Sequence, residues 1–264
     1  MKLITDVHAH YDEAVFNEDR DEVLRSLHEG GVAFIINSGS EVPSSERSIR
    51  LAEAYDFVWA SVGVFPLESW TDNGGRYPGW LSEIERLAGH KKVCAIGEIG
   101  LDYRMIAEAE DKEAYKRMQK EVFVPQIELA NRLDKPIVIH DCEADEDFLE
   151  IFDAHPFRGM IHRFFSELRY GREILERGLY LGIGPQITYP NSQKLLDIVR
   201  EMPADRLLLE TDAPFLPTYP LECRATSDMI EAVCEKIAEV RGDMTPDEAA
   251  AVAYENAKRL FNIG

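Results

Sequence analysis

The sequence predicts a (β/α)8 barrel, and three observations support that fold class. Short runs of β-branched and apolar residues occur eight times, polar segments with helical periodicity separate them, and the chain is 264 residues long. Strands that alternate with helices indicate βαβ units and a parallel sheet. Eight such units in roughly 250 residues are the usual dimensions of this fold, the TIM barrel.

Each predicted element is assigned to a segment of the chain. The predicted strands cover residues 3–7, 33–37, 58–64, 93–97, 136–139, 159–161, 180–183 and 206–209. The predicted helices between them cover residues 19–28, 44–54, 80–87, 111–133, 144–154, 166–177 and 192–202. Two further helices close the chain, at residues 227–240 and 246–261. Thr245, Pro246 and Glu248 give the last helix an N-cap, a proline at its first position and a capping-box glutamate.

A single domain over residues 1–264 is expected, because no linker, low-complexity run or short repeat divides the chain. A doubly wound open sheet is the structural alternative, since the same alternation of strands and helices produces it. A G-x-G-x-x-G fingerprint after the first strand would support a dinucleotide site in such a sheet, and the sequence has none there. The barrel is therefore the preferred prediction.

The charge of the chain limits the kinds of partner it can attract. The sequence has 29 Lys and Arg against 49 Asp and Glu, so its formal charge is 29 − 49 = −20. A non-specific nucleic-acid binder carries a basic stripe that neutralises phosphates, and a strongly acidic molecule lacks that general attraction. If the substrate is a nucleic acid, the attraction must be local. A chain of this size also folds without metal, so a metal site requires a chemical reason.

The sequence indicates a cytoplasmic protein that does not enter a membrane. No window approaches 18 uninterrupted apolar residues, and residues 1–6 lead directly into a strand-like run with no signal-peptide pattern. The cysteines, Cys94, Cys142, Cys223 and Cys234, form no C-x-x-C pair, which is typical of reduced thiols. No obligate protein partner is indicated.

Residues with metal-binding side chains follow five of the predicted strands. They are His8, His10, Glu98, His140, His162 and Asp212. The C-terminal ends of barrel strands meet on one face, and that face carries the active site. Imidazoles with carboxylates suit Zn²⁺, Mn²⁺ or Fe²⁺ and, with fewer histidines, Mg²⁺. Two ions that share a carboxylate fit this number of ligands and can clamp both oxygens of a displacement at phosphorus.

The positions of these residues matter more than any one motif. Residues i and i+2 of a strand face the same side, so His8 and His10 can reach one ion. An isolated H-x-H pair is weak evidence, because a single buried histidine is usually a hydrogen-bonded core residue. Joint occurrence at equivalent positions of a repeat favours a metal site. His28, His90 and His155 fall on predicted helices or loops and are expected on the solvated surface.

The same segments resemble the TatD-type metal-dependent deoxyribonucleases, barrel hydrolases of the amidohydrolase superfamily. The resemblance covers nearly the whole chain. It rests on residues 6–10 (DVHAH), 95–103 (AIGEIGLDY), 136–140 (PIVIH), 161–164 (IHRF), 209–214 (LETDAP) and 255–261 (ENAKRLF). The segments at 95–103 and 209–214 are the longest and most specific of these.

The resemblance implies a site with two divalent ions, Zn, Mn or Mg, and a metal-activated water as nucleophile. In this arrangement one ion is held by His8, His10 and Asp212, the other by His140 and His162, and Glu98 bridges them. Asp212 and Glu98 are then the catalytic carboxylates, with Asp212 as the general base. Glu210 would orient a ligand, although a salt bridge at a strand end is an equal alternative.

Departures from the family pattern concern substrate binding. Phe65 stands where the family has a histidine, Cys142 where it has an arginine, and Arg163 where it has a small cysteine. In the altered loop 218–224 only Arg224 could replace a phosphate-binding guanidinium. Phe65, Arg163 and Arg224 are therefore the candidate substrate-binding residues. Cys142 is expected to ligate metal or to stay protonated, because no positive neighbour activates it as a nucleophile.

Aromatic residues gather after the third predicted strand. Trp70, Tyr77 and Trp80, with Phe65, could stack bases as aromatics do in single-strand binders, or they could pack a lid. Residues 68–79 are rich in glycine and aromatic residues and read as a mobile flap over the site.

These observations predict a metal-dependent hydrolase that cleaves phosphodiester bonds, a TatD-like deoxyribonuclease of the 3′-end exonuclease type acting on DNA ends. The alternative is an amidohydrolase-type enzyme for a small phosphoester, amide or lactone, which the neutral Phe65 and Cys142 and the acidic surface favour. A barrel that has lost activity and serves as a scaffold is the second alternative. Retention of all six ligand-type residues argues against that alternative.

Overall fold

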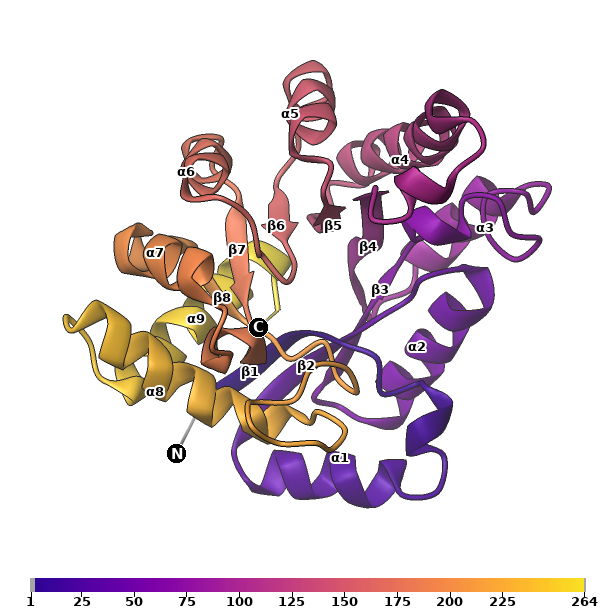
Figure 1. The fold of residues 1–264 in the computed structure, drawn as a ribbon. Coiled ribbons are helices and arrows are strands. Elements are labelled where there is room, and N and C mark those ends of the chain that lie inside the picture. The colour runs from indigo at the N-terminus through magenta and orange to yellow at the C-terminus, as the bar shows by residue number, and fades with distance from the viewer. Residues whose placement is uncertain (1–2, 264) are drawn as a thin grey trace. The chain divides into compact units, whose positions relative to one another are not determined.

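A computed structural model describes residues 3–263 of the chain, over which strands and helices alternate (Figure 1). The strands are β1 (Ile4–Ala9), β2 (Val32–Ser38), β3 (Val58–Val62), β4 (Val93–Asp102), β5 (Ile137–Cys142), β6 (Gly159–Ile161), β7 (Tyr180–Ile183) and β8 (Leu207–Leu209). The α-helices are α1 (Arg20–Glu29), α2 (Val42–Ala54), α3 (Trp80–Ala88), α4 (Lys112–Arg132), α5 (Asp145–Ala154), α6 (Leu168–Glu176), α7 (Gln193–Glu201), α8 (Ile230–Arg241) and α9 (Pro246–Phe261). The strands follow the order β1-β2-β3-β4-β5-β6-β7-β8. Each predicted strand corresponds to an observed one, so the sequence pattern is confirmed.

The described residues form two compact units. Unit 1 comprises those of Met1–Asn37, Tyr55–Val58 and His162–Gly264, and unit 2 comprises Ser38–Ala54 and Trp59–Ile161. Each unit combines parallel strands with the helices that follow them. The expectation of a single domain over residues 1–264 stays a prediction.

In unit 1 the end of the chain's last strand returns to its first. β1 pairs in parallel with β2, and β7 with β8. Beyond β8, the backbone N–H of Asp212 donates to the carbonyl of His8 at 2.9 Å, and that of His10 donates to the carbonyl of Ala213 at 2.6 Å. First and last strands are neighbours in a closed barrel, whereas a doubly wound sheet places the last strand at an edge. This pairing excludes the doubly wound alternative.

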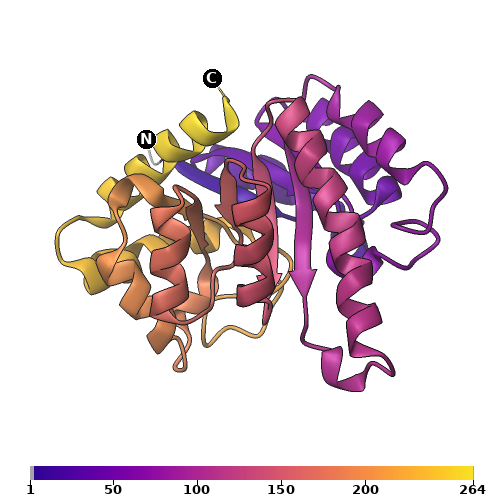
Figure 2. The ribbon, with the colours of Figure 1, turned by 90° about the horizontal axis from the view of Figure 1, so that it is seen from above.

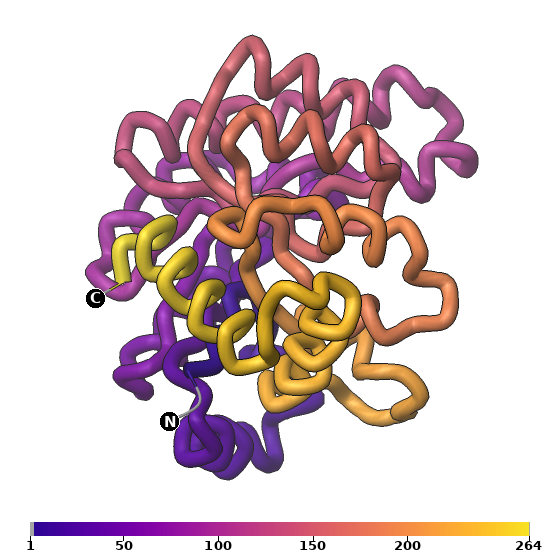
Figure 3. The backbone as a smooth tube through the Cα atoms, turned by 90° about the vertical axis from the view of Figure 1, so that its left-hand side faces the viewer, coloured from indigo at the N-terminus to yellow at the C-terminus, as the bar shows by residue number. Residues whose placement is uncertain are grey.

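The C-terminal helices cover the β1 and β8 side of unit 1. α9 packs on β1, on β8 and on α8, and the last two helices lie side by side (Figure 3). α9 begins with the expected capping box, in which Thr245 and Glu248 each bond to the other's backbone N–H. Buried Asn256 of the same helix donates to the carbonyls of Ala204 and Leu207, both at 2.8 Å. These bonds fix the start of β8 against α9.

In unit 2, β4 is longer than the sequence predicts. It runs on from Val93–Gly97 to Asp102 and pairs with β5 as far as Asp102 opposite Cys142, and all ten of its residues are buried. Gly100 permits this pairing, because a Cβ there would lie 1.9 Å from the carbonyl oxygen of His140. Charged residues and glycines interrupt the apolar run in the sequence, which is why the prediction stopped at residue 97. The extension keeps Glu98 and Asp102 on one strand.

Helix α4 lies along β4 in unit 2 (Figure 2) and holds two strand ends through buried glutamines. Gln126 accepts from the backbone N–H of Val64 at 2.8 Å and donates to the carbonyl of Val64 at 3.1 Å. Two helical turns earlier, Gln119 makes the same pair of bonds with Asp102, at 2.7 and 2.8 Å. Each side chain thus replaces a missing strand partner, as buried backbone groups require.

Two expectations about the environment of the chain can be compared with the structure. No helix among residues 3–263 is both long and apolar enough to cross a membrane. All four cysteines are free thiols, with Cys94 and Cys234 buried. Burial raises the pKa of Cys94 to about 12, which makes it inert. A cytoplasmic location stays a prediction.

The first testable prediction concerns Gln126. In Gln126→Leu, both backbone groups of Val64 lose their partner inside the core, and each unsatisfied buried group costs about 1–3 kcal/mol. We expect the free energy of unfolding in urea to fall by about 2 kcal/mol or more. Gln193→Leu, on the exposed start of α7, is the matched control and should change stability by less than about 0.5 kcal/mol. Equal stability of the two variants would contradict the role given to Gln126.

Candidate metal centre

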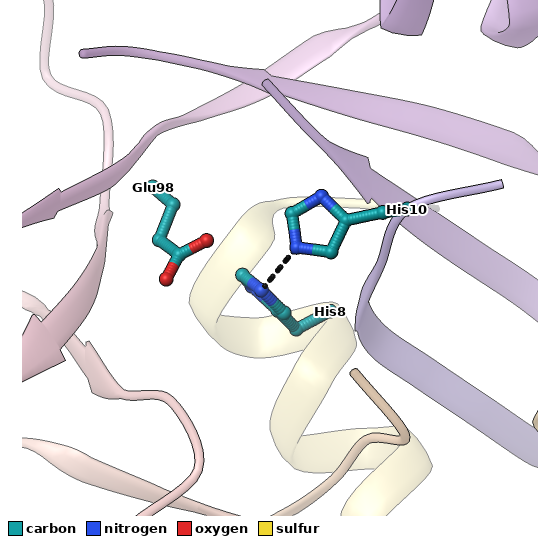
Figure 4. Close-up of side chains that lie close together, drawn as sticks. All are labelled: His8, His10 and Glu98. Atoms are coloured by element: carbon teal, nitrogen blue, oxygen red, sulfur yellow. Dashed lines mark hydrogen bonds between the residues drawn. The ribbon is translucent and has the colours of Figure 1, made fainter. Parts of the chain in front are cut away.

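Unit 1 brings four of the predicted ligands together. His8, on β1, and His10, just beyond its end, place their Nε2 atoms 3.1 Å apart (Figure 4). The His162 ring, which follows β6, stacks on His8 with centroids 3.8 Å apart. The Asp212 Oδ1 atom lies 3.5 Å from Nε2 of His8 and 3.4 Å from Nε2 of His10. The expectation that His8 and His10 face the same side is confirmed.

The carboxylate of Asp212 is held in its ionised form. Burial raises its pKa, but hydrogen bonds from the rings of His10 and His8 and the nearby charge of His162 outweigh burial, so the pKa lies well below its usual range. Ligand atoms of His8, His162 and Asp212 all lie within 4.8 Å of one another. Two imidazoles and one carboxylate at such spacing are a donor set that suits a divalent ion.

A buried carboxylate outside the predicted site supports this cluster. Asp6, fully buried, accepts from the hydroxyl of Thr211 at 2.5 Å, from its backbone N–H at 3.0 Å, and from the hydroxyl of Ser227 at 2.7 Å. It also accepts from the backbone N–H of His8 at 3.3 Å. Burial raises the pKa of Asp6 to about 6, and these hydrogen bonds limit the rise. Thr211 directly precedes Asp212, so the hydrogen bonds of Asp6 fix the backbone at His8 and next to Asp212.

Unit 2 contains the other two predicted ligands, Glu98 on β4 and His140 on β5. Both are buried, and Nδ1 of His140 lies 2.9 Å from Oε1 of Glu98. Nε2 of His140 lies 3.0 Å from Oδ2 of Asp102. The ring is therefore held between two carboxylates. Asp102 was part of the motif at residues 95–103, but the sequence alone gave it no role.

The charges around His140 explain how the ring is held. Burial lowers its pKa, but the hydrogen bonds to Asp102 and Glu98 outweigh burial and raise the pKa to about 9. For Asp102, burial raises the pKa, while the bonds from His140 and Arg104 lower it below the usual range. Arg104 contacts both oxygens of Asp102 through its guanidinium. Carboxylates thus engage both imidazole nitrogens of His140. An ion held by Glu98 and Nδ1 would take the place of the proton between them, while Asp102 orients the ring through Nε2 as in known metal sites.

Glu210 contacts one member of the unit 1 ligand set, His162, and the residue that follows it, Arg163. The side chain is buried, its Oε1 lies 3.6 Å from Nδ1 of His162, and it accepts from the backbone N–H of Arg163. This placement is compatible with the predicted orienting role, which stays a prediction.

The candidate substrate-binding residues lie in different surroundings. Phe65 packs edge-on against His140, with ring centroids 4.7 Å apart. Nη1 of Arg163 lies 3.8 Å from Oδ2 of Asp212. Arg224 is already engaged, because its guanidinium pairs with Asp19, donates to the carbonyl of Val15 at 2.9 Å and covers the ring of Phe16. A substrate contact by Arg224 would require that ion pair to open.

The aromatics of the predicted flap are anchored to different degrees. Trp70 packs its ring on Tyr115, with centroids 5.2 Å apart, and Trp80 begins α3. The turn Pro66–Glu68 leads into residues 68–79, whose backbone has several internal hydrogen bonds, such as that from Gly75 N–H to the Glu68 carbonyl at 3.0 Å. Tyr77 is the exposed ring among them.

Comparison with known proteins identifies the family. Residues 5–262 match the family profile described as "TatD related DNase". The chain belongs to the TatD family. The resemblance noted in the sequence is thereby confirmed.

Two TatD-family relatives illustrate the range of names in the family. The chain is 37% identical to YabD of Bacillus subtilis, an "uncharacterized metal-dependent hydrolase", over 99% of this chain and 100% of YabD. It is 32% identical to the "3'-5' ssDNA/RNA exonuclease TatD" of Cronobacter sakazakii, over 93% of each chain.

A solved structure of a TatD homologue confirms the fold class. The crystal structure of YjjV from Escherichia coli K12 matches with a TM-score of 0.88 at 27% identity, over 99% of this chain and 98% of that one. With the strand order and the pairing of β8 to β1, this makes the chain a (β/α)8 TIM barrel of the TatD family.

The donor chemistry of both TatD units fits divalent metal. Unit 1 offers His8, His10, His162 and Asp212, and unit 2 offers Glu98 and His140. All six are buried, and a buried ionised carboxylate is costly unless it is paired or coordinates a cation. The number and identity of the ions, and the bridging role of Glu98, stay predictions.

The second testable prediction concerns Asp102. In Asp102→Asn, His140 loses the carboxylate that holds its Nε2, and loss of such a partner weakens metal binding about 10- to 100-fold. Titration with Zn²⁺ or Mn²⁺ followed by calorimetry measures this affinity. Asp197→Asn removes an exposed carboxylate paired with Arg200 on α7 and should leave the affinity unchanged. Equal affinity of Asp102→Asn and the unmodified protein would show that Asp102 does not position the ligand.

Proposed function

We propose that this chain is a metal-dependent hydrolase that cleaves phosphodiester bonds, acting as a deoxyribonuclease at the 3′ ends of single-stranded DNA. The observation that carries the proposal is the buried, ionised Asp212 beside the imidazoles of His8, His10 and His162. Support for the substrate comes from the relative named as a 3'-5' ssDNA/RNA exonuclease. The family profile described as "TatD related DNase" supports the same reaction class.

The residues proposed to hold two divalent ions, Zn, Mn or Mg, are those predicted from the sequence. They are His8, His10 and Asp212 for one ion, His140 and His162 for the other, and Glu98 for both. Divalent ions supply Lewis-acid polarisation of phosphoryl oxygens and acidify water. Imidazole and carboxylate sets accept several first-row ions, so availability decides which ion is used.

Side chains of the protein itself would accept the proton and keep the ligands in position. Asp212 stays ionised at neutral pH because its pKa is depressed, so one of its oxygens can accept a proton from the attacking water. Asp6 keeps Thr211 and therefore Asp212 in place. Asp102 and Arg104 keep the His140 ring oriented. Phe65 covers the edge of His140 with an apolar surface that limits access of water to the ring.

The charge of −20 shapes how DNA would be bound. Long-range repulsion opposes binding, and bound cations at the strand ends would offset it only locally. Binding should therefore be weak, dependent on divalent metal and confined to strand ends. Tight metal-free binding of duplex DNA is incompatible with this proposal.

A second candidate is a hydrolase for a small phosphoester, amide or lactone. The contact of Phe65 with His140 favours it, because an apolar ring stands where a polar contact to a phosphate chain would be useful. An inactive scaffold is disfavoured by the cost of burying six ligand-type side chains that serve no ion.

The third testable prediction separates these candidates. The metal-loaded protein should release mononucleotides from single-stranded DNA labelled at its 5′ end. Asp212→Asn should lower kcat by about 10²- to 10⁴-fold, the usual contribution of a positioned general base. Excess chelator should abolish release.

The controls and the opposing outcome are specific. Asp205→Asn, an exposed carboxylate on the turn before β8, should retain full activity. Bis(p-nitrophenyl) phosphate serves as the small phosphodiester. Turnover of this ester without any release from DNA would favour the small-molecule hydrolase and reject the nuclease.

A further inference from the structure

Exposed aromatic rings gather on the loops of unit 1 that follow its ligand-bearing strand ends. Phe165 comes after His162, and Phe215 and Tyr219 come after Asp212. Phe215 is 50% exposed and Tyr219 is 57% exposed. Exposed apolar groups that gather on one surface often mark an interaction site. Aromatic rings contribute much of the contact area at such sites. None of these rings belongs to residues 68–80, whose aromatics the sequence assigned either to base stacking or to a packed lid.

Phe215 lies directly beside the ligand set. Its ring meets the His10 ring edge-on, with centroids 6.0 Å apart. The backbone N–H of Phe215 donates to the carbonyl of Asp212 at 2.9 Å, which closes a tight turn. The ring is therefore fixed relative to the carboxylate proposed to be the general base.

Tyr219 and Tyr189 form a preorganised pair further along the same loop. Their ring centroids lie 6.4 Å apart in an edge-to-face arrangement. The hydroxyl of Tyr189 donates to the carbonyl of Pro217 at 2.9 Å, and the backbone N–H of Tyr219 donates to the hydroxyl of Thr188 at 2.8 Å. These bonds fasten the loop after β8 to the turn Pro185–Thr188 after β7. These contacts hold the exposed Tyr219 ring in a fixed position.

Arg163 provides a cation beside Asp212, the residue at which the turn to Phe215 begins. Its Nη1 approaches Oδ2 of Asp212 at 3.8 Å, longer than a hydrogen bond, and its side chain is 34% exposed. Burial raises the pKa of Tyr189, and the positive charge of Arg163 opposes that rise. Its backbone N–H is held by Glu210. A partly exposed guanidinium beside a proposed catalytic carboxylate suits a phosphate.

We propose that Tyr219, supported by Tyr189, stacks the base of the terminal nucleotide together with Phe215 of the same loop, and that Arg163 binds the adjoining phosphate. This inference rests on the proposed nuclease function and deepens it. The preferred substrate is then a strand end that carries a base, because a planar heterocycle stacks favourably on an exposed aromatic ring. The neighbouring cation selects a nucleotide over an uncharged aromatic ligand.

The test compares two single strands that differ only at the 3′ end. One ends in adenosine and the other in an abasic residue, and kcat/KM is measured for the metal-loaded protein. Tyr219→Leu should lower kcat/KM about tenfold on the base-ended strand and leave the abasic-ended strand unchanged, since stacking involves only the base. Tyr219→Phe keeps the ring and should restore the original value. Leu221→Ala, an equally exposed apolar residue of the same loop, should have no effect on either strand.

Arg163→Met tests the phosphate contact. It should lower kcat/KM on both strands alike, because both carry the same phosphate. It should also reduce the slope of log kcat/KM against log salt by about 0.7, the value for one lost phosphate contact on a single strand. An unchanged slope would reject the role given to Arg163.

A binding measurement separates failure of this inference from failure of the nuclease function. A strand with 2-aminopurine at its 3′ end and a phosphorothioate in its last linkage reports stacking by fluorescence quenching and needs no turnover. Quenching that Tyr219→Leu abolishes, without cleavage of any strand, would keep the stacking subsite and reject the nuclease. If Tyr219→Leu left cleavage unaltered, or lowered it equally on the base-ended and abasic-ended strands, the nuclease function would stand and the proposed stacking subsite would be rejected.

Discussion

The buried carboxylate of Asp6 holds together the part of unit 1 on which the proposed chemistry depends. It joins the first strand, the residue before Asp212 and the turn at Ser227 through hydrogen bonds to backbone and hydroxyl groups. Burying a carboxylate without such partners would cost folding free energy, so Asp6 can occupy this buried position only because it makes these hydrogen bonds. Three features lie within two residues of these bonds: the pairing of the chain's last strand with its first, His8 itself, and the start at Asp212 of the turn to Phe215.

Unit 2 uses a different device to position its ligands. Two glutamines of α4 bond to the backbone of Val64 and Asp102, and Asp102 in turn holds the His140 ring. Amide side chains supply both a donor and an acceptor, so one residue satisfies a strand end completely. The helix therefore determines where the Asp102 carboxylate lies. Because Asp102 holds Nε2 of His140, an ion shared with Glu98 would use Nδ1. Arg104 balances the charge of this arrangement.

The strands and helices could be predicted from the sequence where the hydrophobic periodicity is strong. The side-chain contacts between distant residues could not. Alternating apolar and polar runs defined eight strands, and the positions of His8, Glu98 and Asp212 after them defined the ligand set. The extension of β4 was missed because Glu98 and Gly100 break the apolar pattern that a buried strand usually shows.

Pairings between distant residues carry no local signal. Arg224 bonds to Asp19, 205 positions away in the chain, so the sequence gave no reason to discount it as a phosphate ligand. The Asp6 network and the Tyr189 and Tyr219 pair are of the same kind, since they depend on loops that meet only after folding. Residue types and spacing therefore indicated the metal chemistry better than the surface that would select a substrate.

Gly100 also limits how this site could change by evolution or by design. With a carbonyl oxygen 1.9 Å from where any Cβ would lie, even alanine would force β4 and β5 apart at the point where Glu98, Asp102 and His140 are held. New specificities are therefore accessible through the loops after β6 and β8, whose side chains are exposed and tolerant. The register of β4 and β5 tolerates no side chain at Gly100, so divergence should accumulate in exposed loops and not in these two strands.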